Sequence, residues 1–98
     1  MQIKFEWDKG NINKNYEKHK VTDNECEEIF FDAQLEVFHD KKHSTLEDRF
    51  YAIGQTVRSR TLFVVFTIRK NKTRIISARD INKKERLLYE KIKKNTQV

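Results

Sequence analysis

A group of cationic and aromatic residues in this 98-residue sequence has the side-chain types that phosphate chemistry requires. Cleaving RNA without a metal ion needs a base for the 2′-hydroxyl proton, cations for the crowded phosphorane, and an acid for the leaving oxygen. Arginine suits the phosphate because its planar fork donates two parallel, charge-assisted hydrogen bonds. Histidine is the side chain that titrates near neutrality. The candidates are Lys18, His19, Arg49, Arg69, Arg74 and Arg79, with Tyr51 and Tyr89 as aromatic neighbours.

The segment 74–79 has the pattern of a buried strand with a cation at each end. Ile75 and Ile76 are β-branched and suit a pleated, buried surface. Regular alternation would place Ile75, Ser77 and Arg79 on one face and Arg74 on the other, so the two arginines are expected to have different roles. Arg79 precedes a predicted helix. It either projects into a polyanion site or lies at the sheet edge with its guanidinium in water.

Other polar residues have plainer alternatives. His19 lies beside Lys18 at the predicted end of a helix, and its chemistry alone favours a cap of that end against the helix dipole over a catalytic role. Cys26 is expected to be a small core residue, because no electropositive neighbourhood is evident that would form a thiolate. His39 and His43 have i, i+4 spacing, but their loop is lysine-rich and the chain has one cysteine, so no metal site is predicted.

The charge is divided unevenly along the chain. Residues 1–50 contain 8 Lys/Arg and 12 Asp/Glu, whereas residues 51–98 contain 13 Lys/Arg and 3 Asp/Glu. A basic half suggests an anionic partner, with nucleic acid the leading candidate, although lysine-rich helices also keep a small domain soluble. The single cysteine fits a reducing compartment, and neither a signal peptide nor an apolar run of ~20 residues is evident. We therefore expect a cytoplasmic protein without a membrane partner.

The hydrophobic periodicity predicts one α+β domain over residues 1–98. Capping boxes at Thr22/Glu25 and Asn82/Glu85 predict two helix starts, and Ile12 and Tyr16 have the spacing of a packed helix face. Short turns predict an antiparallel meander of about four strands, with the helices packed on one face and Gly54 permitting a bulge. The predicted strands are 3–7, 35–38, 49–54, 61–69 and 74–79, and the predicted helices are 11–20, 23–31 and 82–94.

Several motifs, taken in order, resemble those of the BrnT toxins, which are small ribonucleases of type II toxin–antitoxin systems with a fold similar to RelE toxins. The resemblance covers about residues 3–90. One departure is Lys20, where the family usually has a glycine that would end the helix in a left-handed conformation. The motifs are Phe5-Glu6-Trp7-Asp8, Asn15, Lys18-His19-Lys20-Val21, the Glu/Phe-rich helix, Asp48-Arg49, residues 62–69, residues 74–79 and Lys84-Glu85-Arg86.

The resemblance implies an endoribonuclease that arrests growth and needs no metal or organic cofactor. It also implies a BrnA-type antitoxin partner, a dimeric DNA-binding protein, so that DNA is contacted only through the antitoxin. In this reading Arg79 and Arg49 stabilise the phosphate and His19 is the acid or base. The residues expected to bind RNA are Lys18, Arg69, Arg74 and Tyr51.

Two other classes of function fit the same sequence. A non-catalytic nucleic-acid-binding module would show salt-sensitive binding without strand scission, and the charge division supports it equally well. A protein-interaction domain would bind a neighbouring gene product and do no harm when expressed alone. The feature that separates the ribonuclease from both is the convergence of His19, Arg49 and Arg79 in space.

Overall fold

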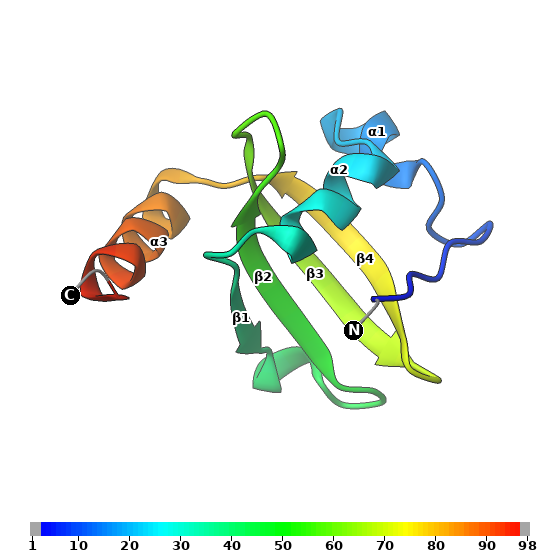
Figure 1. The fold of residues 1–98 in the computed structure, drawn as a ribbon. Helices are drawn as coiled ribbons and strands as arrows, with labels where there is room; N and C mark the ends of the chain where they lie inside the picture. The colour runs from blue at the N-terminus through cyan, green and yellow to red at the C-terminus, as the bar shows by residue number, and fades with distance from the viewer. Residues whose placement is uncertain (1–2, 97–98) are drawn as a thin grey trace.

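A four-stranded antiparallel sheet organises the chain, and the computed structural model describes residues 3–96 (Figure 1). The strands lie in the sheet in chain order, so the predicted meander and the α+β class are confirmed. The apolar run of β3 is buried between β2 and β4, as a continuous β-branched and aromatic segment predicts. The strands are β1 (Glu36–His39), β2 (Arg49–Gln55), β3 (Thr61–Arg69) and β4 (Lys72–Asp80).

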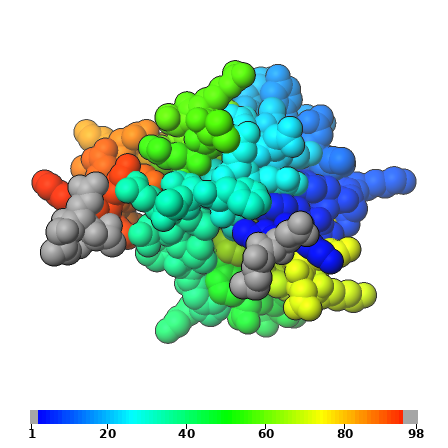
Figure 2. Space-filling model, viewed as in Figure 1, coloured from blue at the N-terminus to red at the C-terminus, as the bar shows by residue number. Residues whose placement is uncertain are grey.

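The N-terminal helices cover one face of the sheet (Figure 1). They are α1 (Lys14–His19), α2 (Asp23–Glu28) and the 3₁₀ turn η1 (Ile29–Phe31). Cys26 and Ile29 pack there against Leu62 and Val64, and all four are fully buried. Cys26 is fully buried, which confirms that it is a core residue, and this burial raises the pKa of its thiol to about 12. In space-filling view, α2 and η1 lie across the middle of this side of the molecule (Figure 2).

The C-terminal helix α3 (Lys83–Thr96) lies beyond the other face, which corrects the expectation that all helices share one face (Figure 1). Ile53 and Phe63 alternate with the core residues of β2 and β3, and they line a groove with Leu88 of α3. Tyr89 is buried at 3% exposure, and its hydroxyl donates to Asp32 at 3.3 Å. Within residues 3–96, no helix is long and apolar enough to cross a bilayer.

Both predicted capping boxes are present. The Thr22 hydroxyl accepts from the Glu25 amide at 3.1 Å, and the Glu25 carboxylate accepts from the Thr22 amide at 2.9 Å. At α3, the Asn82 side chain accepts from the Glu85 amide at 2.8 Å, and Glu85 accepts from the Asn82 amide at 3.0 Å. Each glutamate is therefore held in place by the helix that it begins.

The predicted N-terminal strand and first helix are partly wrong. Residues 3–7 form a single bridge, between Phe5 and Thr73, instead of a strand. The helix α1 begins later than expected because Asn13 has a left-handed backbone with φ 60°. Ile12 and Tyr16, predicted to pack, are 52% and 44% exposed.

Asparagine side chains face the sheet instead and bond to the backbone of β4. The Asn11 amide donates to the Ile75 carbonyl at 3.0 Å, and the Asn15 carbonyl oxygen accepts from the Ala78 amide at 2.9 Å. These bonds satisfy backbone groups that an edge strand would otherwise leave open. The side of this segment that faces the sheet is therefore polar, whereas the sequence predicted an apolar face made by Ile12 and Tyr16.

A β-bulge changes the alternation of β4. The register shifts between Val65 and Phe66, which pair with Ser77 and Ile75, so Ile76 is the extra residue. Ile75 and Ala78 consequently share the helix-covered core. The prediction that Ile75 lies on the same face as Arg79 is therefore wrong.

Gly54 has a packing role and no bulge, because the pairing of β2 with β3 stays regular through Gln55. A Cβ at Gly54 would lie 3.1 Å from the Ile29 Cβ and 3.2 Å from the Ile29 carbonyl oxygen. The glycine thus permits η1 to approach β2 closely.

Candidate functional site

Arg79 lies between an aromatic ring and a carboxylate. Its guanidinium donates two hydrogen bonds of 2.8 Å to the two carboxylate oxygens of Glu85. Its Cζ atom lies 4.4 Å from the centre of the Phe63 ring, to which it is paired across β3 and β4. The hydrogen bonds to Glu85 raise the pKa of Arg79, and the side chain is 36% exposed. The Arg79 guanidinium is therefore partly buried and held by two neighbours, instead of lying free in water at the sheet edge.

Glu85 occupies the place on this fork where a phosphate would bind. Burial alone would raise the pKa of Glu85, but hydrogen bonds from Arg79 and the Asn82 amide outweigh burial and hold the pKa below its ordinary value. The two parallel bonds match the geometry by which arginine binds two phosphate oxygens. An RNA phosphate would therefore have to exchange with Glu85.

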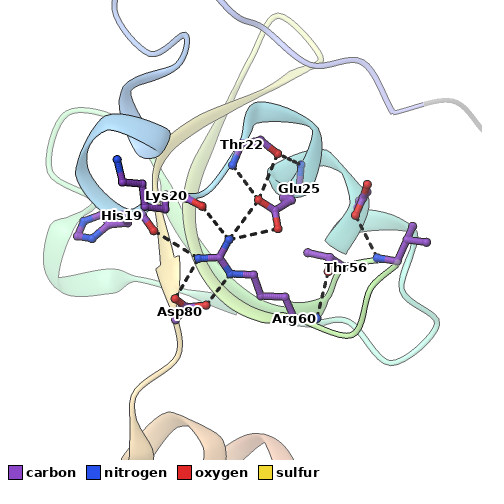
Figure 3. A network of polar contacts seen from close by, with 9 residues as sticks. His19, Lys20, Thr22, Glu25, Thr56, Arg60 and Asp80 are labelled. Atoms are coloured by element: carbon purple, nitrogen blue, oxygen red, sulfur yellow. Dashed lines mark hydrogen bonds and ion pairs between the residues drawn. The ribbon is translucent and has the colours of Figure 1, made fainter.

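A second arginine, Arg60, joins the end of α1 to the end of β4 (Figure 3). Its Nε and Nη2 atoms donate to the Asp80 carboxylate at 2.7 and 3.0 Å. Its Nη1 donates to the Lys20 carbonyl at 2.8 Å and to both Glu25 oxygens at 3.2 Å, and its Nη2 donates to the His19 carbonyl at 3.3 Å. Arg60 therefore fixes the backbone that carries His19.

Lys20 ends α1 in the left-handed conformation, with φ 58° and ψ 33°. The family glycine expected at this position would adopt that conformation without strain, whereas a residue with a Cβ does so at a cost of about 1–2 kcal/mol. The Lys20 amide still donates to the Tyr16 carbonyl at 3.0 Å. The conformation is kept, and the hydrogen bond from Arg60 to the Lys20 carbonyl supports it.

His19 and Arg79 lie at the same end of the sheet but on different sides of it. His19 and Lys18 are exposed at the end of α1, which packs against β4 on the side of the N-terminal helices. Hydrogen bonds from Arg60 are the main cause of the lowered pKa of Asp80, and nearby His19 makes a smaller contribution. Arg79, the residue before Asp80, instead packs on Phe63 toward α3. The two candidate residues flank the terminus of β4 without touching.

Arg49, Arg69 and Arg74 lie at the opposite end of the sheet. Arg49 and Arg74 both pair with Thr67, whereas Arg79 pairs with Phe63, which pairs with Ile53. Arg49 is four residues from Ile53, about 13 Å along β2. The structure therefore does not bring Arg49 to Arg79, and His19 lies on the other side of the sheet. The convergence of these three residues, which was expected to separate a ribonuclease from the two other classes of function, is not observed.

Two arginines at this opposite end are paired with carboxylates. Arg74 is 13% exposed and donates to Glu6 at 2.9 Å and to both Asp8 oxygens at 2.9 and 3.0 Å. Arg69 donates to both oxygens of Glu47 at 2.9 and 3.1 Å. The prediction that Arg74 and Arg79 lie on opposite faces is wrong, because each is next to a core residue of β4, Ile75 or Ala78, and both therefore lie on the face opposite the core. The two arginines nevertheless hold different segments of the chain.

Tyr51 lies between the two ends of the sheet, in a row of rings. It stacks on Phe38 of β1 with ring centres 4.9 Å apart, and on Phe63 of β3 with ring centres 5.2 Å apart. Arg79 extends the row onto β4 through its contact with Phe63. All four side chains are half-buried, so the row crosses the whole sheet at its surface.

Acid is expected to destabilise the fold through the carboxylates that hold these arginines. Burial alone would raise the pKa of Glu25, but its bonds to Thr22 and Arg60 hold this pKa below the ordinary 4.5. The pKa of Glu85 is likewise held below 4.5 by hydrogen bonds. Near and below pH 4.5 the unfolded chain therefore binds more protons than the folded chain. The stabilisation that is present above pH 4.5 is lost as the pH falls through the lower pKa values that these carboxylates have in the folded state. Urea unfolding at pH 7, 5, 4 and 3 measures this.

The matched variants separate this effect from general acid denaturation. Glu85→Gln removes one of the titrating groups, so its free energy of unfolding should fall less between pH 7 and pH 3 than that of the wild type. Glu90 is exposed on the same helix, and Glu90→Gln should leave the pH profile unchanged. Identical pH profiles for the wild type and Glu85→Gln would contradict the assignment.

One comparison with known proteins gives a match. The family model of BrnT, the ribonuclease toxin of type II toxin–antitoxin systems, matches residues 7–85. No curated protein matches the chain. The match includes every candidate residue named above except Tyr89, and it ends at Glu85, the partner of Arg79.

Proposed function

Since the chain belongs to the BrnT family, the ribonuclease toxins of type II toxin–antitoxin systems, we propose that it cleaves RNA without a metal ion at the end of β4. The observation that carries this placement is the fork of Arg79 on Glu85, two 2.8 Å bonds beside an apolar groove. A phosphate that replaces Glu85 would meet a guanidinium that still packs on the Phe63 ring, which favours stabilisation of developing charge.

Cleavage needs two proton transfers, and side chains of the protein are proposed to act as the base and the acid. The 2′-oxygen attacks phosphorus and loses its proton to a base, the bond from phosphorus to the 5′-oxygen breaks, and an acid protonates that oxygen. His19 is proposed as one of these two groups, because it is exposed at the same end of the sheet and its backbone is fixed by Arg60. Lys18, adjacent and exposed, is proposed to bind an RNA phosphate.

The remaining cations are proposed as binding residues at a distance from the cleaved bond. Arg49 was expected at the phosphate, but its position at the other end of β2 favours contact with the RNA backbone farther along. Arg69 and Arg74 bind the RNA backbone only if a phosphate replaces the carboxylates with which they are paired. Tyr51 is proposed to contact RNA through its ring.

The family defines two kinds of partner: RNA and an antitoxin protein. We propose that the antitoxin is of the BrnA type and that the toxin acts in the cytoplasm, contacting DNA only through the antitoxin. The excess of cations in residues 51–98 supports an anionic partner for this half of the chain.

Cleavage of RNA in EDTA by the purified toxin, freed of antitoxin, is expected to match cleavage in buffer with magnesium. The products should carry a cyclic 2′,3′-phosphate and a 5′-hydroxyl, because the nucleophile is the 2′-oxygen. A substrate with a single 2′-deoxy residue should resist cleavage at that residue. Gel analysis of end-labelled RNA measures all three results.

Two outcomes would count against this proposal, provided that circular dichroism shows folded protein. Intact RNA in EDTA with cleavage restored by a divalent ion would show a metal-dependent enzyme. A salt-sensitive mobility shift without new RNA ends would favour the non-catalytic nucleic-acid-binding module.

A further inference from the structure

The buried side chain of Asn15 joins the two elements that carry His19 and Arg79. Asn15 lies in the first turn of α1 at 4% exposure, and its side-chain oxygen accepts a hydrogen bond of 2.9 Å from the Ala78 amide of β4. Ala78 immediately precedes Arg79, and His19 follows Asn15 by four residues, one turn later on the same side of the helix. This bond therefore connects the helical turn before His19 to the strand position next to Arg79.

The backbone of Asn15 also fixes the turn that follows His19. Its carbonyl oxygen accepts hydrogen bonds from the amides of Lys20 and Val21. Arg60 holds the same turn from the other side, because its guanidinium donates to the His19 carbonyl at 3.3 Å (Figure 3). The position of His19 relative to β4 therefore depends on Asn15 as well as on Arg60.

Asn15 is bonded to β4 just beyond the bulge of that strand. The bulge inserts Ile76 as an extra residue, and the alternation of side chains resumes after it. Because β4 is the last strand of the sheet, the Ala78 amide has no strand partner, and Asn15 supplies its acceptor. The Asn15 bond therefore helps to fix the part of the strand from which Arg79 reaches the Phe63 ring.

The hydrogen bonds of Asn15 are less complete than those of a second buried asparagine, Asn11. Both residues are 4% exposed. The Asn11 side chain donates to the Glu6 and Ile75 carbonyls at 2.9 and 3.0 Å, and its oxygen accepts from the Asp8 amide at 2.9 Å. The side-chain nitrogen of Asn15, in contrast, is buried without a hydrogen-bond partner among the described residues. An unpaired buried donor lowers the stability of a fold, so stability alone does not account for an asparagine at position 15.

We infer that Asn15 is a positioning residue for cleavage, which does not touch RNA but sets the separation of His19 and Arg79. This inference rests on the proposed function and adds a residue on which the geometry of that site depends. A proton-transfer group and a phosphate-binding cation act on the same phosphodiester only when the elements that carry them keep a fixed separation. The Asn15 oxygen supplies a direct bond between those elements, α1 and β4.

Asn15→Leu removes the bond to β4 together with the unpaired nitrogen, while keeping a side chain of similar size. The kcat for RNA cleavage should fall by about 10²-fold, the loss that a misplacement of about 1 Å can cause. The KM should stay the same, because Asn15 is buried and its bond is made before RNA binds. Steady-state cleavage of a labelled RNA measures both constants.

Two further variants at this position complete the test. Asn15→Asp keeps an oxygen for the Ala78 amide and should recover most of the lost kcat. Asn15→Ser, whose hydroxyl is too short to reach β4, replaces Asn15→Leu if that variant does not fold, and it should show the same fall in kcat.

Asn11→Leu is the matched control, because it makes the same change at an equally buried asparagine. It breaks three side-chain hydrogen bonds, whereas Asn15→Leu breaks one. Asn11→Leu should therefore lower the urea midpoint of unfolding more than Asn15→Leu, yet reduce kcat less. A merely structural role of Asn15 predicts the opposite order, because the loss of kcat would then follow the loss of stability in each variant.

An unchanged kcat in Asn15→Leu, or a fall in kcat at least as large in Asn11→Leu, would overturn the inference. Failure of the proposed function is distinguishable, because it would appear as intact RNA with the wild-type protein in the EDTA assay. Nuclear magnetic resonance gives a readout that needs no cleavage. The ring protons of His19 and the Nε–H of Arg79 should shift in Asn15→Leu and stay near their wild-type positions in Asn11→Leu. Unchanged signals of both groups in Asn15→Leu would also overturn the inference.

Discussion

Replacing Arg79 with alanine is expected to lower the rate of RNA cleavage by about 10²–10³-fold, the usual loss when a preorganised charge donor is removed. The guanidinium packs on the Phe63 ring, so it remains oriented when a phosphate takes the place of Glu85. Arg79→Lys should recover little, because an ammonium group is a point charge without the fork. Single-turnover cleavage of a labelled RNA measures the rates.

A structural role for Arg79 predicts a different pattern. If Arg79 served only to hold α3, Glu85→Gln would impair cleavage as strongly as Arg79→Ala, since either change breaks the same pair. In the phosphate-binding role, Glu85→Gln should keep or raise the rate, because it weakens the group that competes with RNA. Arg86→Ala, an exposed arginine on the same helix, is the charge-matched control and should cleave near the wild-type rate.

Equal losses for Arg79→Ala and Arg86→Ala would show only a general loss of positive charge. Undiminished cleavage by Arg79→Ala would remove Arg79 from the site. Each variant is compared by urea unfolding, so that loss of folding is not mistaken for loss of chemistry.

Local patterns predicted the elements of the fold well. The apolar run of β3 and the two capping boxes depend on residues adjacent in sequence, and the structure confirms them. The bulge in β4 was not predictable, because its cause is the pairing with β3 and the asparagine bonds to Ile75 and Ala78. The side of the sheet taken by α3 depends likewise on contacts between distant segments.

The candidate site was predicted in its residue types more than in its geometry. Sequence order placed Arg79 just before the capped helix, and this proximity makes its bond to Glu85 possible. The separation of Arg49 from Arg79 follows from the strand register, which the sequence does not specify. Arg60 was not among the candidate residues predicted from the sequence. Its partners lie 20 to 41 residues away, so no local spacing pointed to it.

Arg60→Met is expected to lower the free energy of unfolding by about 2–4 kcal/mol, because it leaves two carboxylates and two carbonyls without their donor. The Arg60 side chain is 27% exposed, so its bonds are partly protected from water. Burial alone would lower its pKa, but the bond to Asp80, the largest influence, and those to Glu25 raise the pKa. Urea denaturation at pH 7 measures the loss.

The control for this prediction lies in the same turn. Arg58 is exposed, and Arg58→Met should change the unfolding free energy by less than about 0.5 kcal/mol, as surface substitutions usually do. An equally small effect of Arg60→Met would place its ion pairs among ordinary surface pairs and contradict their structural role. Arg60→Lys should fall between the two, because lysine keeps the charge but cannot reach α1, α2 and β4 at once. This outcome would show that the stability of the fold depends on the guanidinium fork as well as on charge.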